Sequence, residues 1–529
     1  MAAALFSALG KAFPFERKRN KRRGLGDPMH LPPNLRPVDP CFAAEWASGS
    51  LTLAGHTVDT AGCPQVLLTH RNAPEAWYDA LHSFAWLAGV PMSGDDAVAV
   101  AARERCRDFV AVWLDTVPDK LSEPVTRTAR RMLSFLANAD LVLEAASEQL
   151  FDQFCARIEC DVRTLQQGWA RCPEGDASRI LATVAVATAA LAVEHGKELL
   201  AVAQSRLLTE LTLQVLPDGG HVSRDPAIAA DLLADLIPLS QLYVVNDLTP
   251  PAELSAAIRA LSAFVAAFRL GDGSPSALTT HPSRAIDRMR AALDLVPPLP
   301  VVEDGSAGLV RIASGATILL VDTGANEVSP SALAFELSDG RYPLIVSSGV
   351  GPAVAPVGRF ATLCVDQAWT RTTSPPSDLL SARHGSTYQS IGHGDHLLDA
   401  THAGFARHGF AHRRVLELSA DGKRLAGRDT LRPLAGEAEK SAVAVSLHFP
   451  LHPDVRVERG ETASSKHLVL SDGTIWQLTA NKGRLSVEDN VVIMSGRSTR
   501  AWQIVLRASW PMTDAFEWTL ERIEASMIV

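Results

Sequence analysis

The segment Pro297-Pro298-Leu299-Pro300 divides the chain into two parts with different hydrophobic patterns. In front of it, apolar residues recur at intervals of three and four, as they do on one face of an α-helix. The clearest such series is Leu254, Ile258, Leu261, Val265 and Phe268. Behind it, apolar and β-branched residues come in short runs, which is typical of strands. The sequence therefore predicts an α-helical front part, to about residue 296, followed by an antiparallel β-structure.

The front part contains further stretches with helical spacing. They cover residues 77–87, 98–117, 126–150, 180–208 and 229–242. Several alanine-rich helices joined by short loops indicate a layered helical array. Periodicity alone leaves open whether this array is a bundle, a solenoid or a toroid.

Three Asp-Gly pairs punctuate the rear part. Asp339-Gly340, Asp421-Gly422 and Asp472-Gly473 each stand between two apolar runs. Glycine tolerates positive φ, so each pair permits a tight hairpin turn, and three hairpins favour a β-sandwich. We therefore expect a flexible segment over residues 1–40, a helical domain over 41–296 and a β-domain over 301–529.

The composition is that of a folded globular protein. Of the 529 residues, 47% are hydrophobic and 21% are charged, and a chain of this length needs more than one hydrophobic core. The net charge of -9 is spread along the chain, which disfavours a nucleic-acid partner because such a partner calls for a concentrated basic surface. The seven cysteines are scattered without a CxxC pair, so we expect thiols in a reducing compartment.

The N-terminal residues carry their positive charge in an order that does not fit a secretory signal. A mostly apolar stretch at residues 2–13 precedes the Arg and Lys residues at 17–23, whereas a signal peptide has its charge first. We therefore expect a cytoplasmic protein, with a weak amphipathic contact of this segment with a membrane surface as the alternative. The longest uncharged apolar run, residues 180–193, is shorter than the ~20 residues of a membrane-spanning helix, so no transmembrane segment is expected.

A polar segment of the front part forms the first candidate site. It reads Asp218-Gly219-Gly220-His221-Val222-Ser223-Arg224-Asp225-Pro226. The paired glycines permit a sharp bend of the backbone, after which His221 is suited to proton transfer and Arg224 to binding an anion. The alternative is a polar turn between two helices that takes part in no chemistry.

Histidines cluster in the rear part. They are His393, His396, His402, His408 and His412, with Asp395 and Asp399 among them. Imidazole and carboxylate bind divalent metals, so a site for a metal such as zinc is one interpretation, with His393-Gly394-Asp395-His396 as its partial motif. Histidines on a surface loop are the other interpretation. His448 and His452 flank a strand-like run, where a structural role is the default.

Several segments resemble the heparinase II/III family of polysaccharide lyases, especially its proteobacterial members. These segments cover residues 81–87, 218–226, 332–341, 402–405, 412–414, 418–422, 448–453 and 503–506. They are collinear over most of the chain. The resemblance implies a multidomain α + β protein, in which an N-terminal incomplete α/α toroid is followed by a C-terminal antiparallel β-sandwich.

The resemblance also implies a reaction. Lyases of this family cleave uronic-acid-containing polysaccharides by β-elimination, which needs a group that neutralises the carboxylate, a base and an acid. The family's Tyr-His pair after the Asp-Gly-Gly turn falls here on Ile228 and Ala229, and its catalytic histidine in the sandwich falls on Phe360. None of these three side chains transfers a proton.

One hypothesis is therefore a polysaccharide lyase with relocated residues. His221 would act as base or acid, Arg224 would neutralise the carboxylate, and His402 or His452 would come from the sandwich. The residues expected to bind the substrate are Asp218, Gly219, Gly220, Arg413 and His452.

The second hypothesis is a protein that binds an anionic polysaccharide, an oligosaccharide or another partner without cleaving it. Arg224, Arg413 and Arg414 would then hold carboxylates or sulfates by charge-assisted hydrogen bonds. A hydrolase with paired carboxylates is a third class, but no motif in the rear part supports it. Because lyases of this family are often exported, the resemblance makes the cell envelope or periplasm the alternative location.

Overall fold

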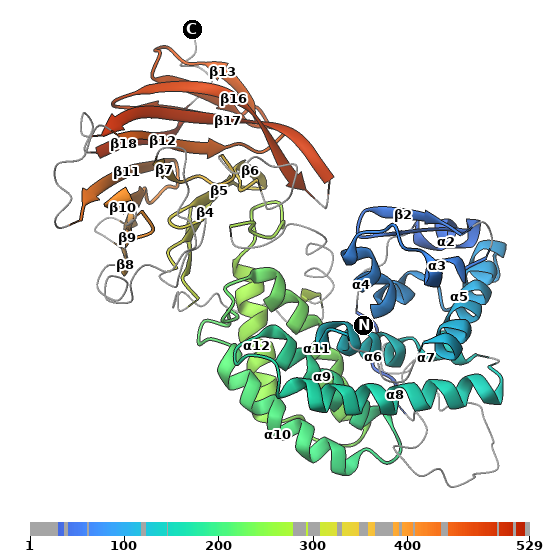
Figure 1. Cartoon of the computed structure of the whole chain (residues 1–529). Coiled ribbons are helices and arrows are strands. Elements are labelled where there is room, and N and C mark those ends of the chain that lie inside the picture. Colours follow the sequence, from blue (N-terminus) through green and yellow to red (C-terminus); the bar gives the residue numbers. More distant parts are fainter. Residues whose placement is uncertain are drawn as a thin grey trace. The chain divides into compact units, whose positions relative to one another are not determined.

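The structure is a computed structural model, shown in Figure 1. It describes residues 30–35, 41–60, 63–117, 123–144, 146–278, 293–294, 307–324, 331–348, 358–365, 385–390, 394–405, 408–434, 443–494, 497–510 and 515–523. The chain divides into a helical unit and a β unit. The helical unit contains Met1–Leu216, Ala230–Ala260 and Asp287–Pro297, and the β unit contains Pro217–Ala229, Leu261–Ile286 and Pro298–Val529.

Helices form the front part of the chain, blue to green in Figure 1. Their bounds are α2 (Phe42–Ser48), α3 (Val66–Thr69), α4 (Glu75–Ser83), the 3-10 helix η1 (Ala85–Gly89), α5 (Ala97–Thr116), α6 (Val125–Ala137), α7 (Ala139–Leu143), α8 (Glu148–Trp169), α9 (Ala177–Ala192), α10 (Lys197–Gln214), α11 (Pro226–Val245) and α12 (Ala252–Ala267). A short hairpin of β1 (Ser50–Leu53) and β2 (His56–Asp59) lies among them.

Side-chain caps fix the starts of three long helices. Asp96 accepts a hydrogen bond from the backbone N–H of Ala99 at the start of α5, and Ser147 and Asp176 cap α8 and α9 in the same way. Each cap satisfies a backbone donor that the helix itself leaves unpaired. The local sequence thus determines where these three helices begin.

Helix α9 is the core helix of the helical unit. It packs against α6, α8 and α10, and its residues from Arg179 to Ala192 are all buried. The small side chains of alanine let the neighbouring helices approach closely. The long apolar run in the sequence is therefore an interior helix.

Three of the predicted helical stretches have different boundaries in the structure. Residues 77–87 contain most of α4 and the start of η1, with a break at Phe84. Residues 126–150 contain α6, α7 and the first turn of α8, and residues 180–208 contain most of α9 and part of α10, with a break at residues 193–196. The predictions of helix type are confirmed there, but each predicted stretch contains a turn that its apolar spacing does not reveal.

One helix of the described residues is long and apolar enough to cross a membrane. It is α11, whose most apolar window has a mean hydropathy of 1.5 and is 61% buried within the protein. A buried helix of this kind in a soluble protein passes the same test of length and composition.

Strands form the rear part, yellow to red in Figure 1. Their bounds are β3 (Leu309–Ser314), β4 (Thr317–Asp322), β5 (Phe335–Asp339), β6 (Tyr342–Ile345), β7 (Leu363–Val365), β8 (Gly385–Ser390), β9 (His396–His402), β10 (Phe410–Leu418), β11 (Arg424–Pro433), β12 (Val443–Pro450), β13 (Arg456–Arg459), β14 (Ser465–Val469), β15 (Ile475–Ala480), β16 (Arg484–Met494), β17 (Arg497–Trp510) and β18 (Ala515–Ile523).

The strands pair antiparallel in three sheets of the described residues. One eight-stranded sheet has the order β13-β14-β15-β18-β11-β10-β9-β8, and two four-stranded sheets have the orders β16-β17-β12-β7 and β3-β4-β5-β6. The prediction of a helical front and an antiparallel β rear is confirmed.

All three Asp-Gly pairs lie at hairpin turns, as predicted. Gly340 joins β5 to β6, Gly422 joins β10 to β11, and Gly473 joins β14 to β15. Their φ angles are 54°, 71° and 88°, a backbone conformation that glycine adopts without a steric penalty.

Aromatic rings from distant strands form the centre of the β core. Phe335 of β5 stacks on Trp518 of β18 with ring centroids 5.4 Å apart, and Phe449 of β12 meets the same indole edge-on at 5.1 Å. Gly427 lies directly opposite Trp518, and a Cβ atom at Gly427 would come within 2.1 Å of the indole. The glycine therefore makes room for the tryptophan.

Candidate functional site

The loop that contains the Asp-Gly-Gly motif belongs to the β unit. One carboxylate oxygen of Asp218 accepts a hydrogen bond from the backbone N–H of Gly220 at 2.8 Å, and the other accepts one from Ala307 at 2.7 Å. Gly219 has a φ of 84°, and a Cβ atom at Gly220 would lie 2.5 Å from Ala307. Asp218 and both glycines thus fix the loop against Ala307, two residues before the start of β3.

Arg224 reaches the same point from the other end of the loop. Its Nε donates to the carbonyl of Ala307 at 2.9 Å, and its Nη2 donates to Gly308 at 3.2 Å and to a carboxylate oxygen of Asp322. The other Asp322 oxygen accepts from the Ser331 hydroxyl at 2.6 Å. The structure therefore brings Asp218 and Arg224 together, and both hold the open end of the β3–β4 hairpin.

His221 lies inside the same loop and has no exposed surface. Its Nδ1 lies 2.7 Å from the hydroxyl of Ser223 and accepts a hydrogen bond from the backbone N–H of that residue at 3.0 Å. An Nδ1 that accepts a bond from an N–H leaves the ring proton on Nε2. The buried imidazole thus stabilises the turn through its contacts with Ser223.

His402 belongs to a buried chain of hydrogen bonds in the eight-stranded sheet. Its Nδ1 accepts from the backbone N–H of Gly404 at 2.9 Å, so its Nε2 donates to Nδ1 of His412 at 3.1 Å. The Nε2 of His412 then donates to Asp429 at 2.7 Å. This set of tautomers uses both ring nitrogens of both histidines.

Asp429 is the charged end of this chain. Burial alone would raise the pKa of Asp429, but the Arg414 guanidinium and His412 outweigh it and hold that pKa well below its usual range. Arg414 donates to the carboxylate at 2.7 Å, and the indole N–H of Trp518 donates to its other oxygen at 2.9 Å. The buried carboxylate thus ties β10, β11 and β18 together.

Burial has the opposite effect on His412. It lowers the pKa of that imidazole more than the hydrogen bond to Asp429 raises it. The ring therefore stays neutral at neutral pH, in agreement with the direction of its hydrogen bonds.

Arg413 lies next in sequence but on the partly exposed side of the sheet. It forms a two-pronged ion pair with Asp399, whose Oδ1 accepts from Nε at 2.8 Å. This hydrogen bond lowers the pKa of Asp399. The guanidinium is therefore already engaged with a carboxylate.

His452 differs from the other predicted site residues because one of its ring nitrogens is unpaired. Its Nδ1 accepts from the backbone N–H of Asp454 at 3.3 Å, while its buried Nε2 has no hydrogen-bond partner among the described residues. Burial lowers the pKa of this ring. By contrast, His448 contacts Ser446 and Gln503 through its two nitrogens.

The zinc hypothesis concerns residues that lie partly outside the described ranges. His393 is one of these, and nowhere among the described residues do three or more metal-binding side chains lie close enough together to hold an ion. Whether the chain holds zinc therefore stays a prediction.

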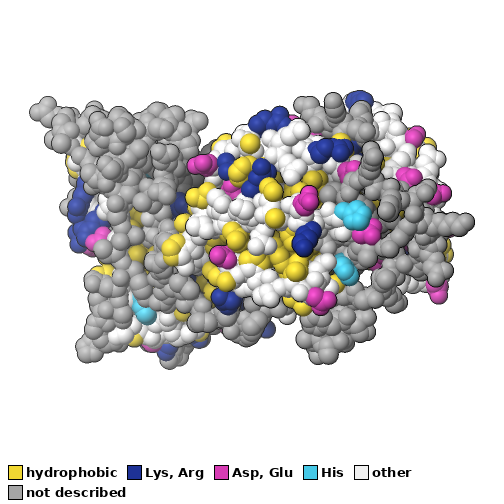
Figure 2. Space-filling model, turned by 90° about the horizontal axis from the view of Figure 1, so that it is seen from below, with side chains coloured by type: hydrophobic (Ala, Val, Ile, Leu, Met, Phe, Trp, Pro, Cys, Tyr) yellow, Lys and Arg dark blue, Asp and Glu magenta, His cyan; other side chains and the backbone are white. Residues whose placement is uncertain are grey.

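Charged side chains are mixed on the face seen in Figure 2. Lys and Arg stand singly there among acidic and apolar side chains. The structure also describes a hollow in the helical unit of about 460 Å³, open solvent included. Its polar lining is Asn34, Ser134, Asn138, Thr188 and Asp235.

Sequence reasoning missed the acidic partners of the site. Asp322 and Asp429 neutralise Arg224 and Arg414 over separations of 98 and 15 residues. No short motif contains both members of either pair. The one signal for Asp429 is its place in a strand of alternating pattern, where a charged residue faces the core.

A helical unit followed by antiparallel sheets, with an Asp-Gly-Gly loop fixed to the β3–β4 hairpin, is typical of the α/α-toroid and β-sandwich class. Residues 297–519 match the family described as "Heparinase II/III-like, C-terminal". The resemblance seen in the sequence is thereby confirmed for this part of the chain, which is a heparinase II/III-like C-terminal domain.

Solved structures share this fold, and two of them serve as examples. A heparinase III crystal structure aligns with a TM-score of 0.65 at 14% identity and covers 86% of this chain and 78% of that one. A mutant of the heparan sulfate lyase HepC from Pedobacter heparinus gives 0.60 at 13% identity, covering 93% and 84%. The predicted toroid followed by a sandwich is thereby confirmed.

A relative that matches most of the chain is named for the protein FtsZ and not for a polysaccharide. FtsZ-localized protein C of Caulobacter vibrioides (strain NA1000 / CB15N) is 27% identical over 514 residues, which cover 90% of this chain and 87% of that protein.

Proposed function

We propose that this chain is a heparinase-like protein that works by binding, without cleaving polysaccharide, and that its partner is FtsZ. The observation that carries the proposal is the 27% identity with FtsZ-localized protein C over 90% of the chain, a span that includes both units. The helical unit is related to that protein as well as the β unit.

The chemistry of the candidate residues supports a role without catalysis. A general base must reach its substrate, yet His221, His402 and His412 are buried. Arg224 and Arg413 are paired with Asp322 and Asp399, so neither guanidinium is offered to a uronate carboxylate. The residues at the family's catalytic positions, Ile228, Ala229 and Phe360, transfer no protons.

Two measurements on the full chain test this proposal. The chain is expected to bind immobilised, purified FtsZ from the same organism. It is also expected to produce no ultraviolet absorbance of unsaturated uronates from heparin, heparan sulfate, alginate or glucuronan. Absence of FtsZ binding together with elimination of any of these polymers would reverse the proposal.

A lyase with relocated residues is the second candidate, because the family match covers residues 297–519. In it, His221 transfers the proton, Arg224 neutralises the carboxylate, and either His402 or His452 contributes from the β unit. Its test is the same absorbance assay with the His221→Ala variant. An elimination activity that disappears in this variant supports the lyase, and an unchanged activity removes His221 from it.

A cytoplasmic location accompanies the FtsZ proposal. Fractionation of cells should place the chain with cytoplasmic markers, with the membrane fraction holding it if the N-terminal segment makes the proposed surface contact. Recovery in the periplasm would contradict the proposal. Metal analysis of protein purified without a histidine tag tests the zinc hypothesis, which requires near-stoichiometric zinc.

A further inference from the structure

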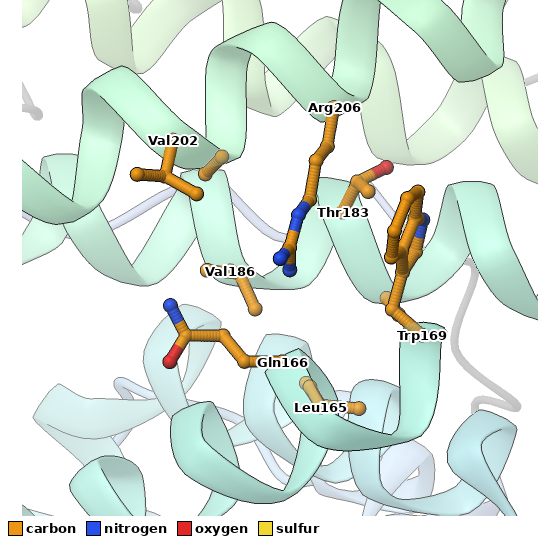
Figure 3. A pocket seen from close by; sticks show the side chains of 9 residues that line it. Leu165, Gln166, Trp169, Thr183, Val186, Val202 and Arg206 are labelled. Atoms are coloured by element: carbon orange, nitrogen blue, oxygen red, sulfur yellow. The ribbon is translucent and has the colours of Figure 1, made fainter. Parts of the chain in front are cut away.

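Two hollows in the described part of the helical unit have different linings. The hollow between α8, α9 and α10 is lined mainly by apolar side chains such as Val186 and Val202, and its free volume of about 10 Å³ admits about one water molecule (Figure 3). The hollow between α6, α9 and α11 has a polar lining, and residues 32–35 form one of its walls. Its free volume of about 40 Å³ admits about three waters. A larger ligand therefore fits the second hollow only in the place of residues 32–35.

Residues 30–35 form a strap along this second hollow, and the strap is neither helix nor strand. Its two prolines, Pro32 and Pro33, restrict themselves and the residue before them to extended backbone. Pro32 is buried, and because a proline has no N–H, its burial leaves no backbone donor without a partner. The sequence of the strap thus suits an extended segment that lies in a groove without pairing to a sheet.

Two hydrogen bonds attach the strap to the helices. The backbone N–H of His30 donates to the carbonyl of Ala192 at 3.3 Å, and Nδ2 of Asn34 donates to Oδ1 of Asn138 at 3.1 Å. Asn138 is itself oriented, because its Nδ2 donates to the carbonyl of Ser134 at 2.7 Å. This bond leaves Oδ1 of Asn138 as an acceptor for the strap. The site therefore selects a side-chain donor at the position after the two prolines.

The strap leaves part of the polar lining without a partner. Thr188 of α9 lines the hollow and is 1% exposed, and its hydroxyl has no hydrogen-bond partner among the described residues. A buried hydroxyl of this kind is costly unless water or a ligand satisfies it. The carboxylate of Asp235, in the same lining, is already paired with Arg130 at 2.5 Å. The hollow thus keeps a hydroxyl that the strap does not satisfy.

We propose that the strap is the exchangeable occupant of a peptide-binding groove between α6, α9 and α11. The groove binds an extended segment in which two prolines precede a side-chain amide, and the strap itself shows this chemistry. Release of the strap opens the groove to a segment of the same chemistry on another polypeptide. A short tether gives the strap an effective concentration on the order of millimolar, so it fills the groove of the resting chain even at low intrinsic affinity.

The test offers the groove the same segment on a separate molecule. A fluorescent peptide with the sequence of residues 30–35 is titrated with the full chain, and its anisotropy reports binding. In the strap variant, Pro32→Asp places a carboxylate at a buried position and Asn34→Ala removes the amide, so the strap leaves the groove. The strap variant is expected to bind the peptide at least about tenfold more tightly than the unaltered chain, whose groove is free in a tenth of the molecules or fewer.

A second substitution locates the peptide in the groove. Asn138→Ala in the strap variant removes the acceptor for the peptide's asparagine and is expected to weaken binding several-fold. A peptide with alanine at the position of Asn34 should lose the same affinity, and combining the two changes should cost no more than either alone. Gln153→Ala in the strap variant is the matched control, because it removes a side-chain amide of the helical unit that does not line the hollow. Far-UV circular dichroism checks that every variant is folded.

Each outcome decides for or against the groove. Tighter binding by the strap variant, with loss in Asn138→Ala and not in Gln153→Ala, supports it. Equal affinity of the unaltered chain and the strap variant shows that the strap does not compete with the peptide, which overturns the proposal. A folded strap variant that does not bind the peptide overturns it as well, as does an equal effect of Asn138→Ala and Gln153→Ala. FtsZ is absent from these measurements, so the groove and the proposed function are tested separately.

Discussion

His82 lies at the last turn of α4, where Trp113 of α5 donates its indole N–H to the Nδ1 of the ring at 3.0 Å. Burial, with the nearby Arg127 as the second cause, lowers the pKa of His82 to about 4. The protonated ring cannot accept the indole hydrogen bond at Nδ1. The native helical unit therefore requires a neutral His82.

This requirement predicts a loss of stability in mild acid. In the unfolded chain the pKa of His82 is about 6.5, so between pH 6.5 and 4 this imidazole is protonated when the chain is unfolded but neutral when it is folded. The free energy of unfolding therefore falls as the pH drops from 6.5 toward 4. A shift of this size corresponds to a loss on the order of 3 kcal/mol. Urea unfolding followed by far-UV circular dichroism at a series of pH values measures it.

The control is His82→Asn, which keeps an acceptor for the Trp113 indole and does not titrate. Its free energy of unfolding should depend less steeply on pH between 6.5 and 4 than that of the unaltered chain. Equal slopes for the two proteins would show that His82 does not cause the loss.

The buried carboxylate of Asp429 leads to a second prediction for a single residue. Asp429→Asn removes the carboxylate that neutralises Arg414, a side chain that is 1% exposed. An unpaired buried cation costs about 3–5 kcal/mol. Urea unfolding monitored by tryptophan fluorescence is a suitable measurement, because Trp518 donates to this same carboxylate.

Asp399→Asn, on β9 of the same sheet, is the matched comparison. Its pair with Arg413 is about one-third exposed on both sides, so its loss should cost no more than about 1 kcal/mol. Equal destabilisation by the two substitutions would refute the assignment of Asp429 as a buried structural anion.

The residues of the site could be found in the sequence, but their partners could not. His221, Arg224 and His402 stand out because they occur in polar or histidine-rich motifs. Their burial depends on contacts with residues far along the chain, such as the one between Arg224 and Asp322. A sequence motif identifies the side chain, but it does not predict the burial and the distant partners that determine the chemistry of that side chain.

At the scale of elements, the break between α9 and α10 depends on one glycine. A Cβ atom at Gly196 would lie 1.9 Å from the carbonyl oxygen of Ala190. We expect Gly196→Ala to force the turn apart and to lower the free energy of unfolding by about 1–3 kcal/mol. Thermal unfolding of the helical signal measures this change.

Gly55→Ala is the control for the loss of glycine itself. Gly55 has a φ of 77° and nothing within 4 Å of a Cβ atom, so its replacement should cost about 1 kcal/mol through backbone strain alone. The steric argument for Gly196 fails if Gly196→Ala is as stable as the unaltered protein.

Elements could be predicted from the sequence where a motif of a few neighbouring residues determines them. The Asp-Gly turns follow from the conformational freedom of glycine, and all three predicted hairpins are present. Most of α8 escaped the prediction because buried charged residues, Arg157 and Asp161, interrupt its apolar spacing. These two side chains pair at 3.2 Å inside the helical unit. The order of strands in the sheets depends on distant pairings that periodicity does not contain.

At the scale of the whole molecule, the two units do not follow the order of the sequence. The Pro-rich segment at 297–300 marks the change of pattern, yet Pro217–Ala229 and Leu261–Ile286 group with the β unit. The first of these segments supplies Asp218 and Arg224, which satisfy the backbone of Ala307 and the carboxylate of Asp322. A β unit without this loop would lose the ion pair between Arg224 and the buried Asp322.

We therefore predict that a fragment of residues 298–529 is less stable than the β unit within the full chain. Losing Arg224 removes the cation that pairs with the buried Asp322 carboxylate, which costs about 3–5 kcal/mol, and losing Asp218 removes the acceptor of the Ala307 N–H. Tryptophan fluorescence of the buried Trp476 and Trp518 should report unfolding of the fragment at a lower urea concentration. The Arg224→Ala variant of the full chain should lose a large part of the same stability. If the fragment unfolds at the same urea concentration as the β unit of the full chain, the loop does not contribute to the stability of the β unit, and the prediction is wrong.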